Sequence, residues 1–241
     1  CLLAGRSRAE RELHARTVSL NEHIKEWNCL YAVSHLMADT DRPLDDVLAD
    51  VVNLIPGGFQ HPEHVSARIV LRENVHASGE FRETEWKLAS PILRDGELVG
   101  ALEVCCMVAE QNGKEPFLRE EKVLVDEVTN RLGELLARKE AKQRLQASEE
   151  RHRALFEHSR DAILVYDTGM QTFSTGNPAA LRLFGFHDVE QITSLGPVDL
   201  LPQLQPDGRP SWLCVQEMTD RVIREGVVFF EWRHKRLDGA E

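Results

Sequence analysis

The sequence is poor in positive charge and has no paired-cysteine motif. Its 29 Lys and Arg are outnumbered by 40 Asp and Glu, which gives a formal net charge of −11. A nucleic-acid partner is therefore not expected, because binding to phosphates requires a basic surface. The five cysteines form no CxxC pair, which argues against a zinc finger and a dithiol redox motif. Such cysteine usage is typical of the reducing cytosol.

Signatures of catalysis are missing as well. The glycines of residues 196–226 do not form a phosphate-binding loop, and there is no GGDEF-like motif. The adjacent carboxylates Asp45 and Asp46, like Glu149 and Glu150, fall on predicted helices and are expected on solvated faces. We therefore expect no enzymatic activity in this chain and predict no metal or cofactor, with flavin and haem left as open alternatives.

The chain does not begin with methionine, from which we expect a fragment of a longer protein. Its first residues, Cys1–Ala4, are apolar and are followed by Arg6, Arg8 and Arg11. Basic residues gather at the cytoplasmic end of membrane spans, so a span upstream is one interpretation. Four apolar residues are too few to show a span, and a frayed helix start is the alternative. We expect a cytoplasmic location, with a membrane tether in the full-length protein left open.

Apolar residues near the N-terminus recur at alternating steps of four and three. This spacing predicts a helix with the seam of a two-stranded coiled coil. The seam comprises Leu13, Thr17, Leu20, Ile24, Trp27, Tyr31 and Ser34. A second amphipathic helix is predicted from about Pro43 to Ile55, and the Pro-Gly-Gly sequence at 56–58 ends it.

Alternating residues then predict strands at Val65–Leu71, Trp86–Leu93 and Leu98–Val108, the last two joined by a tight turn at residues 94–97. From about Phe117 to Leu155 the pattern is helical, with no proline and only Gly133 as a glycine, so one long helix is expected. A continuous helix can transmit a register shift between domains, which a Gly/Ser linker cannot.

The long helix carries two apolar seams of different phase, which a stutter near Arg138 would reconcile. The first contains Val125, Val128, Leu132 and Leu135, and the second contains Ala141, Leu145, Ser148, His152 and Leu155. Together with the N-terminal helix, these seams predict a homodimer through parallel helices. The predicted dimer residues are Leu13, Leu20, Ile24, Trp27, Tyr31, Val125, Val128, Leu132, Leu135 and Leu145.

Beyond the long helix, residues 162–167 and 171–175 predict a hairpin, and Asn177-Pro178 is a favoured start for a short helix that runs to about Phe184. An amphipathic helix is predicted from Ser211 to Glu225 and a strand from Val227 to Arg236. The whole chain is therefore predicted to be α+β: two small domains, each with a central antiparallel sheet flanked by helices, joined by a long continuous signalling helix.

The second half resembles a PAS domain of the S-box kind. The resemblance is carried by residues 153–159, Asp161-Ala162-Ile163, Asn177-Pro178-Ala179-Ala180, Leu183-Phe184-Gly185-Phe186, and residues 230–236 with Asp238-Gly239. It covers about Arg151 to the end, without the last two strands of the family. A ligand would then lie between sheet and helices, near Phe184 and Phe229, although apolar residues at such spacings more often form plain core.

The first half resembles a GAF domain in its order of elements and in residues 98–104, Leu-Val-Gly-Ala-Leu-Glu-Val. Only residues 72–85 separate its first two predicted strands, whereas ligand-binding GAF domains usually carry longer loops there. The expected organisation is an N-terminal coiled-coil helix over 1–20, a GAF-like domain over 21–137, a connecting helix over 118–157 and a C-terminally truncated PAS domain over 152–241.

Strand alternation in the GAF-like half separates an apolar face from a half-polar one. The apolar set is Val65, Ala67, Ile69, Leu71, Leu98, Leu102, Val104, Cys106 and Val108, and the half-polar set is Ser66, Arg68, Lys87, Glu103, Cys105 and Met107. If residues 72–85 fold over the polar face, Arg68 and Lys87 would hold a carboxylate or phosphate. The alternative is a solvated face on which Glu103 pairs with one of these cations.

Tandem GAF and PAS domains on one helix resemble the input half of bacterial sensor histidine kinases or diguanylate cyclases. The resemblance implies a cytoplasmic signal-sensing and dimerisation module. It would relay a conformational change through the connecting helix to an output domain, such as a histidine kinase, in the same chain. The alternative is a receptor for a metabolite, nucleotide, flavin or haem, with an anionic ligand on the polar sheet face.

Overall fold

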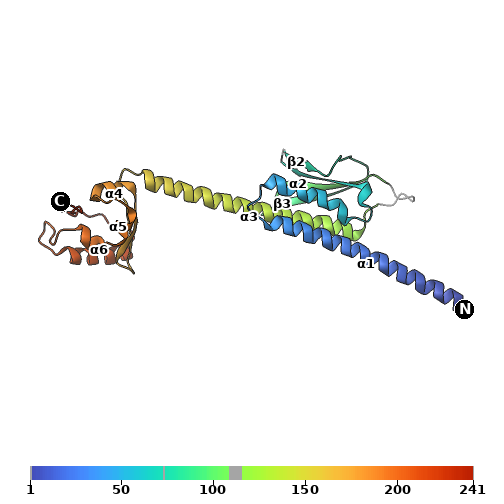
Figure 1. The fold of residues 1–241 in the computed structure, drawn as a ribbon, viewed down its shortest axis with the longest axis horizontal. Coiled ribbons are helices and arrows are strands. Elements are labelled where there is room, and N and C mark those ends of the chain that lie inside the picture. The colour runs from blue at the N-terminus through green and yellow to red at the C-terminus, as the bar shows by residue number, and fades with distance from the viewer. Residues whose placement is uncertain (1, 73, 109–115, 241) are drawn as a thin grey trace. The chain divides into compact units, whose positions relative to one another are not determined.

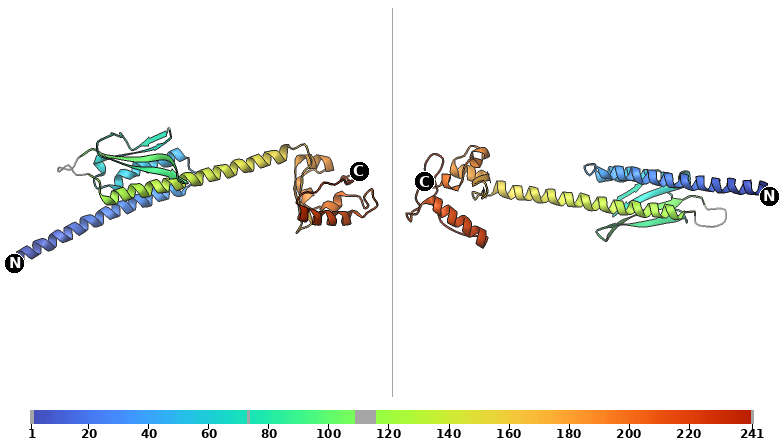
Figure 2. Two further views of the ribbon diagram at one scale, coloured as in Figure 1. Left: turned by 180° about the vertical axis from the view of Figure 1, so that it is seen from behind. Right: turned by 90° about the horizontal axis from the view of Figure 1, so that it is seen from below.

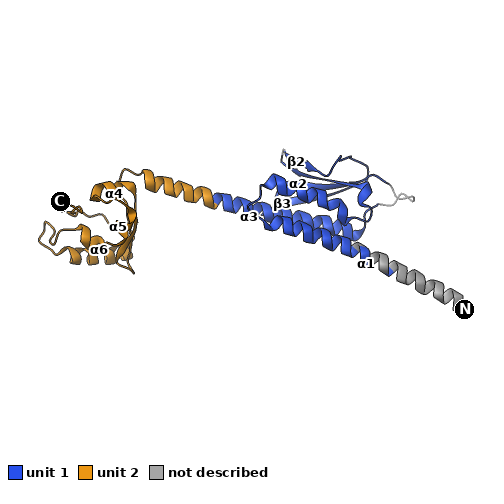
Figure 3. Cartoon of the chain, viewed as in Figure 1, with its two compact units in different colours: residues 1–144 blue, residues 145–241 orange. Residues whose placement is uncertain are grey.

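The structure, a computed structural model, describes residues 2–72, 74–108 and 116–240, and does not describe the side chains of residues 2–15, 17–19 and 22. The chain divides into two compact units, residues 1–144 (unit 1) and 145–241 (unit 2), and the division falls inside one long helix (Figure 3). Both units combine helices with an antiparallel sheet, so the predicted α+β class is confirmed.

Unit 1 is built on a four-stranded antiparallel sheet with the strand order β2-β1-β4-β3. Its strands are β1 (Val65–Leu71), β2 (Asn74–Ala77), β3 (Lys87–Arg94) and β4 (Glu97–Cys106). Its helices are α1 (Leu2–Ala38), α2 (Leu44–Leu54) and α3 (Arg119–His158), with the short 3-10 turns η1 (Ile55–Gly58) and η2 (Pro62–His64). The helices lie on one side of the sheet (Figure 1), and α1 runs beside α3 (Figure 2).

The core of unit 1 fills the space between the helices and one sheet face. Alternate strand residues share a face, so Ala67, Ile69, Leu102 and Val104 all point inward and are fully buried. They meet the apolar stripes of the three helices. Those stripes consist of Cys29, Val33 and Met37 in α1, Val47, Leu48, Val51 and Val52 in α2, and Leu124, Val125, Val128, Leu132 and Leu135 in α3.

Two expectations for the sheet were wrong. Residues 74–77, expected to be loop, form the edge strand β2. Leu98 and Val108, expected in the core, are exposed, the first because of a bulge and the second because it lies beyond the end of β4. At the turn end of β4, the pairing passes from Ile92–Gly100 to Leu93–Leu98, which leaves Val99 as the extra residue of a bulge. A bulge reverses the alternation of side chains, and Val99 packs against the core in place of Leu98.

Unit 2 contains the C-terminal part of α3, a two-stranded sheet and, among its described residues, three further helices. Its elements are β5 (Leu164–Asp167), β6 (Thr172–Gly176), α4 (Pro178–Phe184), α5 (Val189–Thr193), the turn η3 (Pro197–Leu200) and α6 (Ser211–Glu225). The predicted bounds of α6 and the start of α4 are confirmed. Its core is formed by Phe173, Ala180, Phe184, Phe186, Ile192 and Leu200.

The strand predicted at 227–236 is wrong, because no ladder forms there. Strand propensity is expressed only where a neighbouring strand offers a partner. This segment instead makes isolated bonds. Lys235 N–H donates to Leu200 O (3.0 Å), Arg233 N–H donates to the Gln205 side chain (2.9 Å), and Leu237 N–H donates to Phe184 O (3.1 Å).

Candidate functional site

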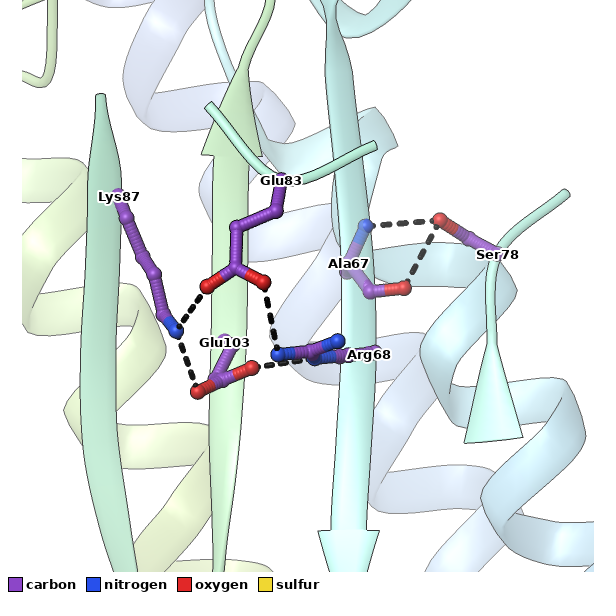
Figure 4. A network of polar contacts seen from close by, with 6 residues as sticks. All are labelled: Ala67, Arg68, Ser78, Glu83, Lys87 and Glu103. Carbon is purple, nitrogen blue, oxygen red and sulfur yellow. Dashed lines mark hydrogen bonds and ion pairs between the residues drawn. The ribbon is translucent and has the colours of Figure 1, made fainter. Parts of the chain in front are cut away.

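The polar face of the unit 1 sheet carries a compact cluster of two cations and two carboxylates. Arg68 of β1, Glu103 of β4 and Lys87 of β3 come from three adjacent strands, and Glu83 reaches them from the segment before β3 (Figure 4). Lys87 Nζ lies 2.7 Å from Glu103 and 3.0 Å from Glu83. Arg68 Nε donates to Glu103, and its terminal nitrogen lies 3.6 Å from Glu83. Each cation therefore contacts both carboxylates.

The segment between β2 and β3 is fastened over this face. The Ser78 hydroxyl accepts from Ala67 N–H (2.8 Å) at the sheet edge (Figure 4), and Thr84 Oγ1 donates to Cys106 O (2.8 Å) at the far end of β4. Between these points the ring of Phe81 lies 4.4 Å from the Arg68 guanidinium, within the range of a cation–π contact. Residues 78–84 thus lie over the polar face, which was the condition set for a ligand site there.

The two cations and the two carboxylates of the cluster compensate each other's charge. Burial raises the pKa of Glu103, but hydrogen bonds from Lys87 and Arg68 outweigh burial and hold this pKa below its ordinary value of 4.5. The hydrogen bond to Glu103, followed by the bond to Glu83, raises the pKa of Lys87. An anionic ligand would have to displace a carboxylate that is already paired. Glu103 thus pairs with both Arg68 and Lys87, whereas the alternative of a solvated face expected a pair with one of them.

Two further residues belong to this face. Cys105, placed in the half-polar set by strand alternation, is fully buried, and a reactive thiolate would need exposure. Glu83 was not anticipated, because a loop residue follows no periodic pattern that would assign it to a face. Its sequence position four residues before Lys87 was the one available signal.

We expect Glu103→Gln to remove an acid-sensitive part of the stability of unit 1. Because the folded pKa of Glu103 is lowered, its stabilisation is complete above the unfolded value near 4.5 and is lost as the pH falls through the lower folded value. At pH 7 the substitution should cost about 1–2 kcal/mol, since the cluster is only partly buried. Urea unfolding between pH 2 and 7 measures the difference, which should shrink toward pH 2.

Glu97→Gln provides the matched control for this experiment. Glu97 pairs with Arg94 at 3.3 Å, and its side chain is 75% exposed, so its removal should leave stability unchanged. A Glu103→Gln protein whose stability follows that of the wild type at every pH would show that the cluster is energetically neutral.

The first seam of α3 faces inward. Val125, Val128, Leu132 and Leu135, predicted as dimer residues, have no exposed surface and belong to the unit 1 core. Their predicted role in a dimer interface is therefore wrong. These side chains pack into the core of their own chain and are not accessible to a second chain. Heptad-like spacing reports an apolar helix face without telling which helix covers it.

The exposed seam residues lie on α1 and on the second half of α3. Leu20, Ile24, Trp27 and Tyr31 are all exposed, as is Leu145. The side chain of Leu13 lies outside the described residues. These exposed positions are the ones at which a second chain can still pack.

Two lysines mark the point where α3 leaves the core. Lys139 Nζ donates to the carbonyl oxygens of Thr40 (2.9 Å) and Arg42 (2.5 Å), and Lys142 pairs with Asp41. Both lysines thus hold the connection between α1 and α2. The change of seam near Arg138 coincides with this point, while the α3 backbone stays helical throughout.

Asn177 is the main polar junction of unit 2. It is fully buried, and its side-chain oxygen accepts from Ile163 N–H and from Ala180 N–H, both at 2.9 Å. Its amide nitrogen donates to Phe156 O (3.1 Å) and to Asp161 O (2.9 Å). The predicted cap is confirmed, but the contact of the same side chain with the last turn of α3 was not predicted.

Comparison with protein families assigns this part of the chain. A family model described as "PAS domain" matches residues 150–220. Residues 150–220 are a PAS domain. No curated protein matches the chain. Among solved structures, the crystal structure of the E. coli DhaR(N)–DhaL complex superposes with a TM-score of 0.37 at 13% identity, covering 91% of this chain and 83% of that chain. A superposition this loose supports no inference about function.

The candidate ligand residues of the PAS domain and its C-terminal continuation do not come together. Phe184 is buried in the core, where its ring lies 6.2 Å from that of Phe186 and 5.5 Å from that of His234. Phe229 is 92% exposed and encloses nothing. Burial lowers the pKa of His234, which keeps its imidazole neutral in this environment. Phe184 thus packs as core, and Phe229 lines no enclosed space.

Neither a metal site nor a membrane span is seen within the described ranges. No group of three or more His, Cys, Asp or Glu is arranged there to hold a metal ion. Likewise, none of the helices described is both long and apolar enough to cross a bilayer.

Proposed function

We propose that the chain is a cytoplasmic signal-sensing and dimerisation module that relays a conformational change through α3 to an output domain such as a histidine kinase. The PAS domain at residues 150–220 supports the sensory role, because domains of this family serve as sensory modules. The proposal assigns no catalytic step and no resident cofactor to this chain. Residues 21–137 take part as a GAF-like domain.

The observation that carries the proposal is that α1 is apolar on two sides. One side buries Cys29, Val33 and Met37 in the core of unit 1. The other exposes Leu20, Ile24, Trp27 and Tyr31, and the last two side chains retain 75% and 69% of their accessible surface. A helix with apolar residues all round is stable when both sides are covered. Steps of four, three and four residues along the outer stripe suit the packing of a second, parallel copy of α1.

The exposed part of α3 supports the same arrangement. Every side chain from Ala141 to Leu155 is exposed, although the backbone there remains helical. A helical stretch of this length gains little stability in water on its own, and a partner helix would stabilise it. Leu145 and Leu155 would contribute to that contact. Two such helices in register provide the path by which a change in one domain alters the pairing in the next.

We expect the purified chain to be a dimer and the double variant Leu20→Lys/Ile24→Lys to be a monomer. Burying a Leu or Ile contributes about 1.5–3 kcal/mol, and four lysines at the seam of a dimer would add repulsion. Sedimentation equilibrium measures the molecular mass. Asn21→Lys/Asn28→Lys adds the same charge at exposed positions beside the stripe and should remain dimeric. A wild-type chain that stays monomeric at high concentration would contradict the proposal.

The alternative of an anionic-ligand receptor on the polar sheet face is not favoured. Arg68 and Lys87 are each paired with Glu103 and Glu83, so neither presents an uncompensated charge to a ligand. The histidine kinase in this proposal rests on the resemblance of the tandem arrangement to sensor kinases, and a cyclase output would use the same relay.

A further inference from the structure

The outer face of the unit 1 sheet, which carries the polar cluster in one half, is apolar in the other half. The strand register places one apolar residue of each strand in a row across the sheet, on the same face as Arg68 and Glu103. The hairpin of β3 and β4 extends this row with two leucines that pair with each other, Leu93 (47% exposed) and Leu98 (67% exposed). Together these residues form the apolar patch, which consists of Val70, Val75, Pro91, Leu93, Leu98 and Ala101.

The apolar patch departs from the usual composition of an open sheet face. An antiparallel sheet with one solvated face normally carries polar side chains there, as the half around Glu103 does. The helices α1, α2 and α3 lie on the other side of the sheet (Figure 1), and residues 78–84 lie over the polar half. A contiguous exposed apolar surface beside charged residues is typical of a docking site for another protein.

A groove of about 620 Å³ adjoins the apolar patch, between the β3–β4 hairpin and α3. Its apolar lining is formed by Leu93, Gly133 and Ala137. Its charged lining consists of Asp95 in the hairpin and Glu127, Arg131 and Glu134 on α3. Leu93 belongs to both the apolar patch and the groove, so the two form one continuous surface at the hairpin end of the sheet.

The groove carries uncompensated negative charge. Arg131 donates to the Ser34 hydroxyl and lies 2.8 Å from Glu127. Asp95 and Glu134 are exposed, and neither side chain has an ion-pair or hydrogen-bond partner in the part of the chain that the structure describes. The polar cluster differs, because each of its carboxylates contacts both of its cations. The groove therefore favours a cationic partner.

We propose that this surface docks a basic amphipathic helix of a partner protein, with apolar side chains on the apolar patch and Lys or Arg side chains on Asp95 and Glu134. Exposed carboxylates alone are usually hydrated, but here the adjoining patch supplies apolar area for a docked helix to bury. An added strand is disfavoured at the β3 edge, because Leu93 O closely approaches Gly133 of α3 and Pro91 has no N–H to donate.

A second copy of this chain is a poorer occupant of the surface than a basic partner. The chain has a formal net charge of −11, so the approach of another acidic copy is opposed and that of a basic protein is favoured. The exposed side chains assigned to the dimer lie on α1 and on the second half of α3, outside the apolar patch and the groove. Partner docking and dimerisation are therefore separate properties.

The probe is a helical peptide of about 15 residues that contains Leu, Lys and Ala, with its leucines on one face. A second peptide has Glu in place of Lys, and a third has the first composition with its leucines spread around the helix. Fluorescence anisotropy with the purified full chain should give a Kd below about 100 µM for the first peptide at low salt, and at least about tenfold weaker binding of the other two. Equal affinity for the three peptides, or no binding at about 1 mM, would overturn the proposal.

A charge-neutralising variant tests the groove. Asp95→Asn/Glu134→Gln should weaken the basic peptide about fivefold, because two exposed ion pairs are lost. Asparagine suits position 95, where φ is 51°, since it tolerates the left-handed conformation. Glu85→Gln/Glu120→Gln is the matched control, which removes the same charge at exposed positions outside the groove and should leave the affinity unchanged.

A second variant tests the apolar patch. Leu98→Ser should weaken the peptide about tenfold, whereas Val123→Ser, at a similarly exposed residue of α3, should not. Unchanged affinity in either Leu98→Ser or Asp95→Asn/Glu134→Gln would place the peptide elsewhere and refute the assignment. Sedimentation equilibrium without peptide tests the other occupant: a lower molecular mass of Leu98→Ser than of the wild type would assign the surface to a second copy and reject the partner helix.

Discussion

Replacing Asn177 by alanine is expected to lower the free energy of unfolding of unit 2 by about 3 kcal/mol. The substitution removes four hydrogen bonds at once and leaves the N–H groups of Ile163 and Ala180 without their acceptor. It also leaves Phe156 O and Asp161 O without their donor. A buried polar group that loses its partner costs more than the net contribution of one hydrogen bond, because water does not replace the partner.

The four bonds of Asn177 can be separated by a second substitution. Asn177→Asp keeps the oxygen that accepts from Ile163 and Ala180 but loses the amide donor to Phe156 and Asp161, and it adds a buried charge. We expect it to remain destabilised, with the amide of Ala180 still protected from hydrogen exchange. In Asn177→Ala that protection should be lost.

Asp188→Ala is the matched control for Asn177→Ala. Asp188 is also a helix N-cap in unit 2, but it is exposed and accepts one bond, from Gln191 N–H at 2.9 Å. Its loss should cost about 1 kcal/mol, the ordinary cost of a missing cap. Urea unfolding of the three proteins compares these values. Equal losses for the two alanine variants would mean that Asn177 serves as a cap and no more.

The second large effect is expected from Gly133→Ala in α3. In an exposed helix this change stabilises by about 1 kcal/mol, because alanine is the better helix former. At this position, however, an added Cβ would lie 2.0 Å from the carbonyl oxygen of Leu93. A backbone atom cannot rotate away as a side chain can, so the hairpin of β3 and β4 must move off the helix. We expect destabilisation of about 3 kcal/mol, at the upper end of the range for overpacking.

Gly57→Ala tests the same substitution where there is room. An added Cβ at Gly57 meets nothing within 4 Å, so the change should be neutral or slightly stabilising. Thermal unfolding measures both variants. The midpoint temperature of Gly133→Ala should fall, and that of Gly57→Ala should rise slightly or stay unchanged. A stabilised Gly133→Ala protein would mean that α3 and the hairpin separate at little cost.

The elements with strong local signals were predicted well from the sequence. The bounds of β1 and α6 are those predicted, because regular alternation and a 3.6-residue apolar stripe are both local properties. The helical path from Arg119 to His158 followed from the absence of proline. Alternation placed Glu103, Arg68 and Lys87 on one face, and it left a pair of Glu103 with one of these cations as an alternative. The structure shows pairs with both.

The incorrect predictions concern packing and pairing partners, which a local sequence pattern does not identify. The stripe from Val125 to Leu135 was correctly recognised as apolar, but its spacing does not tell an internal partner from a second chain. Residues 227–236 have strand-forming composition and yet no neighbour with which to form a ladder. Glu83 became a candidate only through its contacts with Arg68 and Lys87 on the sheet.

Lys139 donates hydrogen bonds to the carbonyl oxygens of Thr40 and Arg42, which lie 99 and 97 residues before it in the sequence. During translation, α1 and α2 therefore leave the ribosome long before α3 exists to cover them. The nascent chain must carry their apolar stripes uncovered until most of unit 1 has been synthesised, since contacts of such sequence separation form late. We expect early truncations of unit 1 to associate with holdase chaperones, and chains that include all of α3 to be released.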